Sequence, residues 1–372
     1  MKKILLLLVA MFAFIGNINA QVWNMVVTHK DGTVQIIKAS DVKNVTFQLP
    51  DQNADQVIIK ELYTTGVPIE NDPKNFFQMD KGFILYNNGG KTAVISNLAI
   101  GILDPYNAQS VANAWYSTGA TEPSYVSQGW VPAACGIWYF PNSLIIEPYS
   151  QVVISCMGAI DNTKTYPQSI NYANKDYYTM YDPESGFKNP KYYPTPADVI
   201  PTSQYLKAVE YGQANAWPLS ATSPGFFIFQ TKNTIPAAFA NDASNITYAP
   251  GKAQNKINAV LKVPTDWIID GVEVYEKINE SKSKKRFGSD VDAGYVMQTV
   301  KLGHSVYRNV DVEATKKIEG NTAKLVYNYQ YGADPSHIDA EASMKNGAKI
   351  VYMDTNNSTS DFHERKQFSL RD

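Results

Sequence analysis

The 372-residue sequence is poor in the side chains that bind transition metals, with 4 His and 2 Cys. A closed structural zinc site takes four such ligands, so a multi-ligand His/Cys cluster is nearly excluded. The sequence also lacks a basic excess, because 33 Lys and Arg stand against 35 Asp and Glu, a formal charge of −2. A protein built mainly to hold nucleic acid needs such an excess. The 44% hydrophobic and 18% charged residues are typical of a globular protein.

Residues 1–20 have the pattern of a secretory signal peptide. Lys2 and Lys3 precede an apolar run over 4–15, and Ala20 provides a small residue before a cut ahead of Gln21. The run is too short to span a bilayer comfortably, and no second run of spanning length follows. No cysteine lies near the cut, so a lipidated mature N-terminus is not expected. We therefore expect a protein exported to the periplasm or cell surface, associated with the outer membrane and without a transmembrane segment in the mature chain.

Cys135 and Cys156 are the two thiols of the sequence, and both lie in apolar stretches. In an oxidising compartment they could form a disulfide. Alternatively, both are buried free cysteines that pack as small hydrophobic residues. We favour the second interpretation, since a disulfide needs a close Cα approach that a sequence does not show.

Short runs rich in β-branched and aromatic residues recur along the chain, and Gly, Pro, Asn or Asp bound each of them. The pattern predicts an all-β fold, with two sheets packed as a sandwich. A short helical turn is expected within 234–243, while Pro201 interrupts a weak helical spacing over 196–211. The predicted strands are 57–63, 82–86, 93–95, 98–103, 137–140, 151–156, 225–229, 270–275, 305–308 and 348–352.

Two parts of the chain stand apart from this domain of residues 55–372. Residues 21–50 predict a small β unit with strands at 23–28, 35–38 and 42–47, followed by a polar linker. Residues 161–217 form a long irregular insertion rich in Tyr, Pro and Asn. Loops of this length usually bind something or fold over a surface.

Several phrases occur along the chain in this order: IIKELYTTG from Ile58, FILYNNGG from Phe83, NLAIG from Asn97, WYFP from Trp138 and LGHSVYR from Leu302. With the phrase at 354–362, this series resembles an uncharacterised family of exported Bacteroidota-type proteins, domain of unknown function 4876. More distantly it resembles the lamin-tail domain, which implies an immunoglobulin-like β-sandwich. The family implies no activity, and its members are expected near outer-membrane receptors. Its members usually begin as lipoproteins and often carry a different β module in front, so this chain departs from them at its N-terminus.

Catalytic motifs do not assemble in the sequence. No Gly-x-Ser-x-Gly elbow, His-Glu-x-x-His pair or phosphate-binding glycine loop is present. Acids suited to a glycosidase pair, such as Glu147 and Asp270, occur in any β protein of this size. Asp354, Asn356 and Asp361 alternate as in a calcium loop, but the sixth position lacks Gly and Arg365 replaces the final Glu. We interpret that segment as a turn and expect no cofactor, with calcium as the one ion considered.

Aromatic residues within 161–217 are the best indication of function. On loops over a rigid scaffold they provide a large contact area, which could stack on a sugar or anchor a protein. They could equally pack the loop onto the sheet, which is the interpretation we favour. The residues chosen as candidate ligand contacts are Tyr177, Tyr178, Tyr192, Tyr193 and Trp217.

Together these patterns predict an exported, non-enzymatic binding or accessory protein of the cell envelope, partnered with an outer-membrane receptor. A glycan-binding module that uses the loop aromatics is the alternative, and a carboxylate-dependent hydrolase is the third possibility. The basic run 281–286 is interpreted as a solvated hairpin tip.

Overall fold

The computed structural model describes residues 23–43, 45, 50–109 and 114–372. The chain divides into two compact units, with the boundary after residue 48. The predicted signal peptide and part of the predicted strand at 42–47 lie outside the described residues. In the part that the structure describes, no helix has the length and apolar content needed to cross a membrane.

The first unit contains a two-stranded antiparallel hairpin, β1 (Asn24–Thr28) and β2 (Val34–Lys38). Val26 lies opposite Ile36 in the ladder. The connection turns at Gly32, whose φ of +86° favours glycine. This hairpin agrees with the strands expected for the N-terminal unit.

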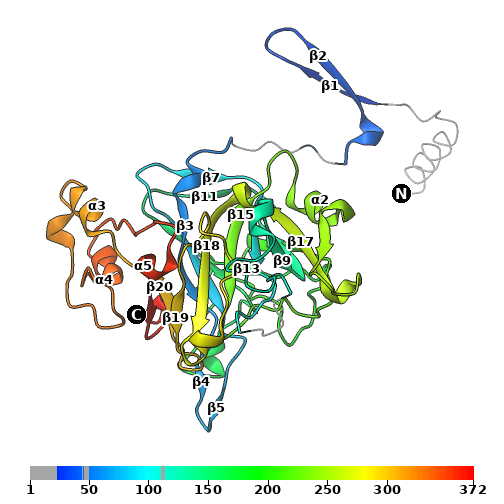
Figure 1. Ribbon diagram of the computed structural model, residues 1–372. Coiled ribbons are helices and arrows are strands. Elements are labelled where there is room, and N and C mark those ends of the chain that lie inside the picture. The colour runs from blue at the N-terminus through cyan, green and yellow to red at the C-terminus, as the bar shows by residue number, and fades with distance from the viewer. Residues whose placement is uncertain (1–22, 44, 46–49, 110–113) are drawn as a thin grey trace, which may run out of the picture. The chain divides into compact units, whose positions relative to one another are not determined.

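The second unit is built around one twelve-stranded sheet in the order β19-β18-β15-β8-β10-β14-β13-β12-β6-β3-β20-β21 (Figure 1). Its strands pair antiparallel except at β12–β13, β13–β14 and β18–β19, which are parallel. The strands are β3 (Val57–Tyr63), β6 (Gly82–Asn87), β8 (Leu98–Ile102), β10 (Gly136–Tyr139), β12 (Gln151–Ser155), β13 (Tyr178–Met180), β14 (Tyr205–Glu210), β15 (Gly225–Gln230), β18 (Ile268–Glu276), β19 (Val296–Gln298), β20 (Ser305–Arg308) and β21 (Phe362–Arg365).

The all-β prediction is confirmed, but the immunoglobulin-like sandwich is not. A sandwich requires two separate sheets, whereas here β13 and β14 join the two halves of the strand set into a single sheet. Both joining strands come from residues 161–217, so this segment is not a wholly irregular insertion. The two end strands, β19 and β21, also approach each other. The amide of Thr299, just after β19, donates to the side chain of Glu364 of β21 at 2.6 Å. The sheet is therefore nearly closed into a barrel.

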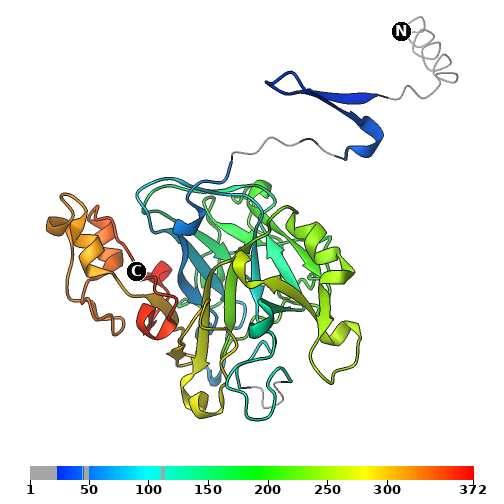
Figure 2. The ribbon, with the colours of Figure 1, turned by 45° about the horizontal axis from the view of Figure 1, so that its top comes forward.

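Smaller elements flank the principal sheet. Strands β9 (Trp130–Ala134), β16 (Ile246–Tyr248) and β17 (Ala259–Pro264) form a three-stranded sheet, β7 (Ala93–Ile95) pairs with β11 (Leu144–Ile146), and β4 (Pro68–Ile69) pairs with β5 (Asp72–Phe76). The helices are short: α2 (Pro236–Asn241), α3 (Val312–Lys317), α4 (Ala340–Lys345) and α5 (Ser358–Asp361). Figures 1 and 2 show α3 and α4 on one side of the principal sheet, with α2 and the three-stranded sheet on the other.

Two of these elements bear on the predicted helices. α2 starts with Pro236 at its first turn, as expected for 234–243. Residues 196–211 instead contain strand β14, because Pro201 lies in an extended conformation and prevents a continuous helix. The segment 348–352, expected as a strand, contributes a single bridge between Tyr352 and Val310.

Both faces of the principal sheet are buried. The inner face carries the main core, in which Trp138, Phe226 and Trp217 are at most 2% exposed. Separate clusters cover the outer face beneath the three-stranded sheet, beneath α3 and α4, and beneath residues 159–200. Packed layers on both faces therefore hold the sheet rigid. A cavity can form among the loops that connect these layers.

The basic run 281–286 is a solvated tip only in part, because Lys282 and Lys284 are exposed as predicted whereas Arg286 is not. Arg286 is fully buried, and its guanidinium lies 2.6 Å from the Glu273 carboxylate of β18. It also donates to the carbonyl oxygens of Pro105 and Ser223. A buried charge of this kind persists because its partner and these acceptors replace the lost water.

Candidate ligand-binding site

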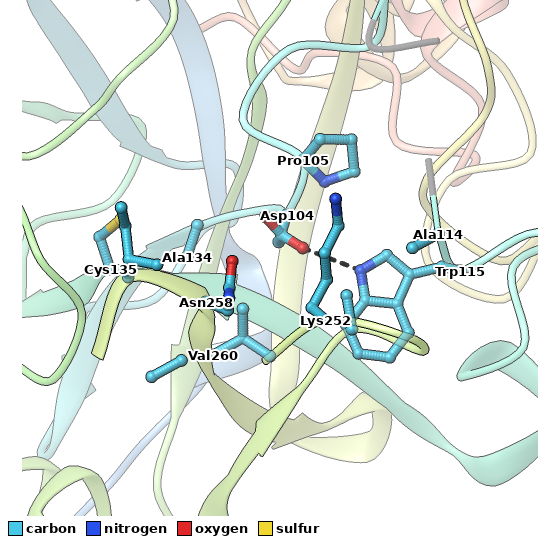
Figure 3. Close-up of a pocket in the computed structure, with 12 residues that line it drawn as sticks. Asp104, Pro105, Ala114, Trp115, Ala134, Cys135, Lys252, Asn258 and Val260 are labelled. Atoms are coloured by element: carbon cyan, nitrogen blue, oxygen red, sulfur yellow. Dashed lines mark hydrogen bonds between the residues drawn. The ribbon is translucent and has the colours of Figure 1, made fainter. Parts of the chain in front are cut away.

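A pocket that is partly open to solvent lies between the three-stranded sheet and the loop that follows β8 (Figure 3). Its volume is about 180 Å³. The described residues that line it are Asp104, Pro105, Ala114, Trp115, Ala134, Cys135, Ala249, Lys252, Ile257, Asn258, Ala259 and Val260.

Asp104 provides the carboxylate of the pocket. The indole Nε1 of Trp115 donates to Asp104 Oδ2 at 2.9 Å, and the backbone amide of Asp104 donates to the carbonyl of Pro132. Burial raises the pKa of Asp104 above its ordinary value, although the hydrogen bond from Trp115 and the charge of Lys252 oppose this shift. The carboxylate is therefore held in one orientation with little water around it.

Trp115 forms a rigid wall beside Asp104. Its side chain is 4% exposed, and its ring meets Tyr125 and Trp130 edge-on, with centroids 5.4 and 5.6 Å apart. Such aromatic contacts favour a single ring orientation. The indole can therefore border a ligand without having to rearrange.

Lys252 and Asn258 bring the other polar groups to the pocket from the segment between β16 and β17. Lys252 is exposed, and Figure 3 shows it facing the same space as Asp104 and Trp115. The amide nitrogen of Asn258 donates to the carbonyl of Ala253 and to Asn255 Oδ1, which fixes the orientation of the amide. The pocket thus combines a carboxylate, an ammonium group and an oriented amide against apolar walls.

Cys135 lies on the wall as an unreactive thiol. Its φ of +62° places it in the left-handed region, and its carbonyl accepts from the amides of Tyr211 and Gly212. Burial raises the pKa of the thiol to about 11, so it stays protonated at neutral pH and is a poor nucleophile. Cys135 and Cys156 are both free in the structure, and of the two Cys156 is buried whereas Cys135 is half-buried.

The five aromatic residues chosen from the sequence do not form one exposed surface. Tyr193 and Trp217 are 4% and 2% exposed, and the amide of Trp217 donates to the hydroxyl of Tyr193 at 2.9 Å. The indole of Trp217 donates to the carbonyl of Gly136 on β10. Tyr193 and Trp217 are therefore core residues rather than ligand contacts, because both pack in the main core on the inner face of the principal sheet.

The remaining three aromatic candidates are half-buried. Tyr178 meets Phe140 edge-on with centroids 5.2 Å apart, and Tyr192 also packs against the main core. Tyr177 packs instead in the cluster on the outer face. These three residues therefore pack the segment onto the sheet, as in the interpretation that we favoured, and do not form one ligand-contact surface.

The residues considered for calcium are arranged around an arginine. Asp354 and Asp361 lie 3.2 and 3.7 Å from the Arg308 guanidinium, and Asp361 also accepts from the amide of Thr355. The amide of Asn356 donates to a carbonyl oxygen at 3.4 Å. Among the described residues, no group of three or more acidic, His or Cys side chains is arranged to hold a metal ion. The segment is a capped turn that pairs its carboxylates with Arg308.

The sequence offered little indication of the Asp104 pocket. Its carboxylate, ammonium and amide groups lie in two separate segments, and none belongs to a motif. One weak signal exists, since Asp104 follows a buried apolar strand directly, and polar residues at strand ends often face a site.

Comparison with known proteins bears on the family and the fold. Residues 147–324 match the family described as a protein of unknown function, DUF4876. A solved DUF4876 family protein from Bacteroides thetaiotaomicron is similar, with 19% identity and a TM-score of 0.58 over 91% of this chain and 80% of that one. No curated protein matches the sequence. The likeness to the lamin-tail domain stays a prediction. The expected resemblance to the DUF4876 family is thus confirmed, by sequence over residues 147–324 and by fold over most of the chain.

Proposed function

We propose that this chain is an exported, non-enzymatic binding protein of the cell envelope, which holds a small polar ligand in the Asp104 pocket and serves an outer-membrane partner. The pocket beside Asp104 is the observation that carries this proposal. Its carboxylate and its amide are oriented by their neighbours, and Trp115 beside them is packed against other rings. Preorganised concave sites of this type are where small ligands usually bind.

The chemistry of the pocket supports binding more than catalysis. Among the described residues that line it, Asp104 is the only carboxylate, whereas glycoside hydrolysis uses a pair. The thiol of Cys135 has a raised pKa, and no histidine lines the pocket among these residues. The described wall therefore offers Asp104 neither an activated nucleophile nor a second acid or imidazole to act with.

The ligand that fits combines a donor and an acceptor. We assign Asp104 Oδ1 to an amine or hydroxyl of the ligand and the Lys252 ammonium to a carbonyl or carboxylate. Ala249 and Val260 line the pocket with apolar side chains. Amino acids, dipeptides and monosaccharides have these features.

A thermal-shift panel of free amino acids, dipeptides and monosaccharides tests the ligand part of this proposal. We expect at least one compound to raise the melting temperature of the mature chain, and Asp104→Asn and Lys252→Met to reduce that shift. Lys277→Met, a change outside the pocket, serves as the control. No shift with any compound, or a shift that both pocket variants retain, would contradict the ligand assignment.

The N-terminal unit supports the part of the proposal that concerns a partner. Within that unit, a two-stranded hairpin exposes Trp23, Val26, Val34 and Ile36 by 55% to 70%. Among the described residues of this unit, β1 and β2 pair with each other alone, and an isolated two-stranded hairpin is marginally stable in water. An outer-membrane protein that packs against this face of the hairpin would cover these apolar side chains.

A further inference from the structure

A second cleft of about 440 Å³ opens beside the end of β15 and the start of β18. It shares no lining residue with the Asp104 pocket. The residues that line it are Asp51, Gln52, Asn53, Ala54, Asp55, Gln230, Lys232, Asp266, Trp267, Ile268 and Ile269.

The cleft lies at an irregularity of the sheet. Ile228 of β15 is opposite Asp270, but the next residue, Phe229, is opposite Ile268, so Ile269 is an extra residue on β18. A β-bulge of this kind changes the direction of nearby side chains and is often found next to binding sites. Here Ile269 and the adjoining Trp267 and Ile268 all line the cleft.

Polar groups on the wall are fixed in pairs. Asp51 accepts from the amide of Ser96 at 2.6 Å and from Gln230 Nε2 at 2.8 Å. The ammonium of Lys232 lies 3.1 Å from the Asp266 carboxylate and donates to the Asp266 carbonyl at 2.6 Å. Two donors therefore hold the Asp51 carboxylate in place, whereas the Lys232–Asp266 pair is exposed and can exchange its contacts for those of a ligand.

Trp267 gives the cleft an aromatic wall. Its ring lies 4.8 Å from that of Phe239, tilted by 56°, and its side chain is half-buried. The contact with Phe239 holds the indole in place while part of it remains open to the cleft. An indole surface packs well against the C–H groups of a sugar ring, because these are apolar and carry partial positive charge.

We propose that this cleft binds a saccharide, either neutral or amine-bearing. Each sugar hydroxyl both donates and accepts, which matches a wall that offers carboxylates, amides and an ammonium group beside an indole. Asp51, Asp55 and Asp266 outnumber Lys232, so the cleft is negative and repels uronic acids and sulfated sugars. The proposal goes beyond the function assigned to the Asp104 pocket, and it places glycan recognition away from the aromatic residues of 161–217.

Isothermal titration of the mature chain provides the test. The probes are neutral cello-, xylo- and manno-oligosaccharides, amine-bearing chitosan oligosaccharides and anionic oligogalacturonate. We expect at least one neutral or amine-bearing probe to bind, no binding of oligogalacturonate, and a loss of affinity of about tenfold or more in Trp267→Ala. Tyr327→Ala removes an aromatic side chain that is 43% exposed and lies outside the cleft, and should bind as the wild type does.

A second variant protects the test against a folding defect in Trp267→Ala, since that residue packs on Phe239. Asp55→Asn changes an exposed carboxylate of the cleft without altering its size. It should keep the melting temperature and shift the preference toward oligogalacturonate. The proposal is overturned if no probe binds, if oligogalacturonate alone binds, or if a folded Trp267→Ala binds as well as the wild type. A saccharide that a folded Trp267→Ala still binds is then tested on Asp104→Asn, which tells the two sites apart because they share no lining residue.

Discussion

Arg308 of β20 and Asp270 of β18 form a buried ion pair, with an Nη2–Oδ2 distance of 2.5 Å, between strands near opposite ends of the principal sheet. Both side chains are at most 4% exposed. The backbone of Ile59 joins them, since its amide donates to Asp270 and its carbonyl accepts from Arg308 Nε. This network connects the two ends of the sheet, which the backbone ladder does not join.

Removing one charge of this pair should be costly. We expect Arg308→Met to lower the free energy of unfolding by about 3–5 kcal/mol, because Asp270 would remain buried without its partner. Urea unfolding measures the change. The exposed pair Lys175–Asp176 is the matched control, and Lys175→Met should cost less than about 1 kcal/mol. Equal costs for the two variants would show that the pair does not close the sheet.

Asp80 should make stability depend on pH. Burial raises the pKa of its carboxyl to about 6, although bonds from Tyr63, Ile170 and Asn162 oppose the shift. Because the folded-state pKa lies above the unfolded one, the contribution is fully present below about pH 4 and is lost as pH rises through about 6. The loss should approach 3 kcal/mol, from a pKa shift of about two units.

The comparison with Asp80→Asn isolates this contribution. Urea unfolding of both proteins between pH 4 and 7 should show the decline in the wild type and a flatter profile in the variant. Parallel profiles would mean that another group causes the pH dependence.

Trp217 distinguishes a core role from a surface role for the aromatic-rich segment. We expect Trp217→Ala to cost about 3–5 kcal/mol, since it empties a site in the main core and removes the bond to Gly136. Tyr327→Ala, at a half-exposed site, should change stability by less than about 1 kcal/mol. Chemical unfolding of both variants is the measurement. A stable Trp217→Ala protein would return this residue to the set of candidate ligand contacts.

The two cysteines should remain reduced and slow to react. With the pKa of Cys135 near 11, about one thiol in a thousand is ionised at pH 8. Iodoacetamide should therefore modify the native protein slowly and add to two thiols after unfolding. A mass that shows a disulfide between Cys135 and Cys156, or rapid alkylation of the native protein, would contradict this expectation.

The strand pattern could be predicted from sequence because it depends on local periodicity and turn residues. The run over β3, VIIKELY, predicts a strand, and the structure contains one. The burial of Lys60 and Glu61 within it could not be foreseen, because their partners are remote. Lys60 contacts Glu341 at 2.5 Å, and Glu61 accepts from the amide of Ser369 at 3.1 Å.

Topology and the binding pockets depend on the same kind of remote pairing. Nothing local indicated that β13 and β14 would pair parallel to their neighbours and merge two sheets into one. Arg286 is another case that local sequence could not predict. Three consecutive basic residues usually mark a solvated turn, yet Arg286 is buried in an ion pair with Glu273. Asp104, Trp115 and Lys252 meet only after folding, so the sequence alone did not single them out.

The proposal that the chain serves a partner in the cell envelope is tested most directly by photocrosslinking in intact cells. A crosslinking residue replaces Ile36 on the exposed face of the hairpin in a C-terminally tagged chain, with Lys175 as the control position. The account predicts that residues 1–20 are removed, that the chain fractionates with the envelope, and that Ile36 alone crosslinks to an outer-membrane protein. Recovery of an unprocessed chain in the cytoplasm, or of a processed chain without any crosslinked partner, would contradict it.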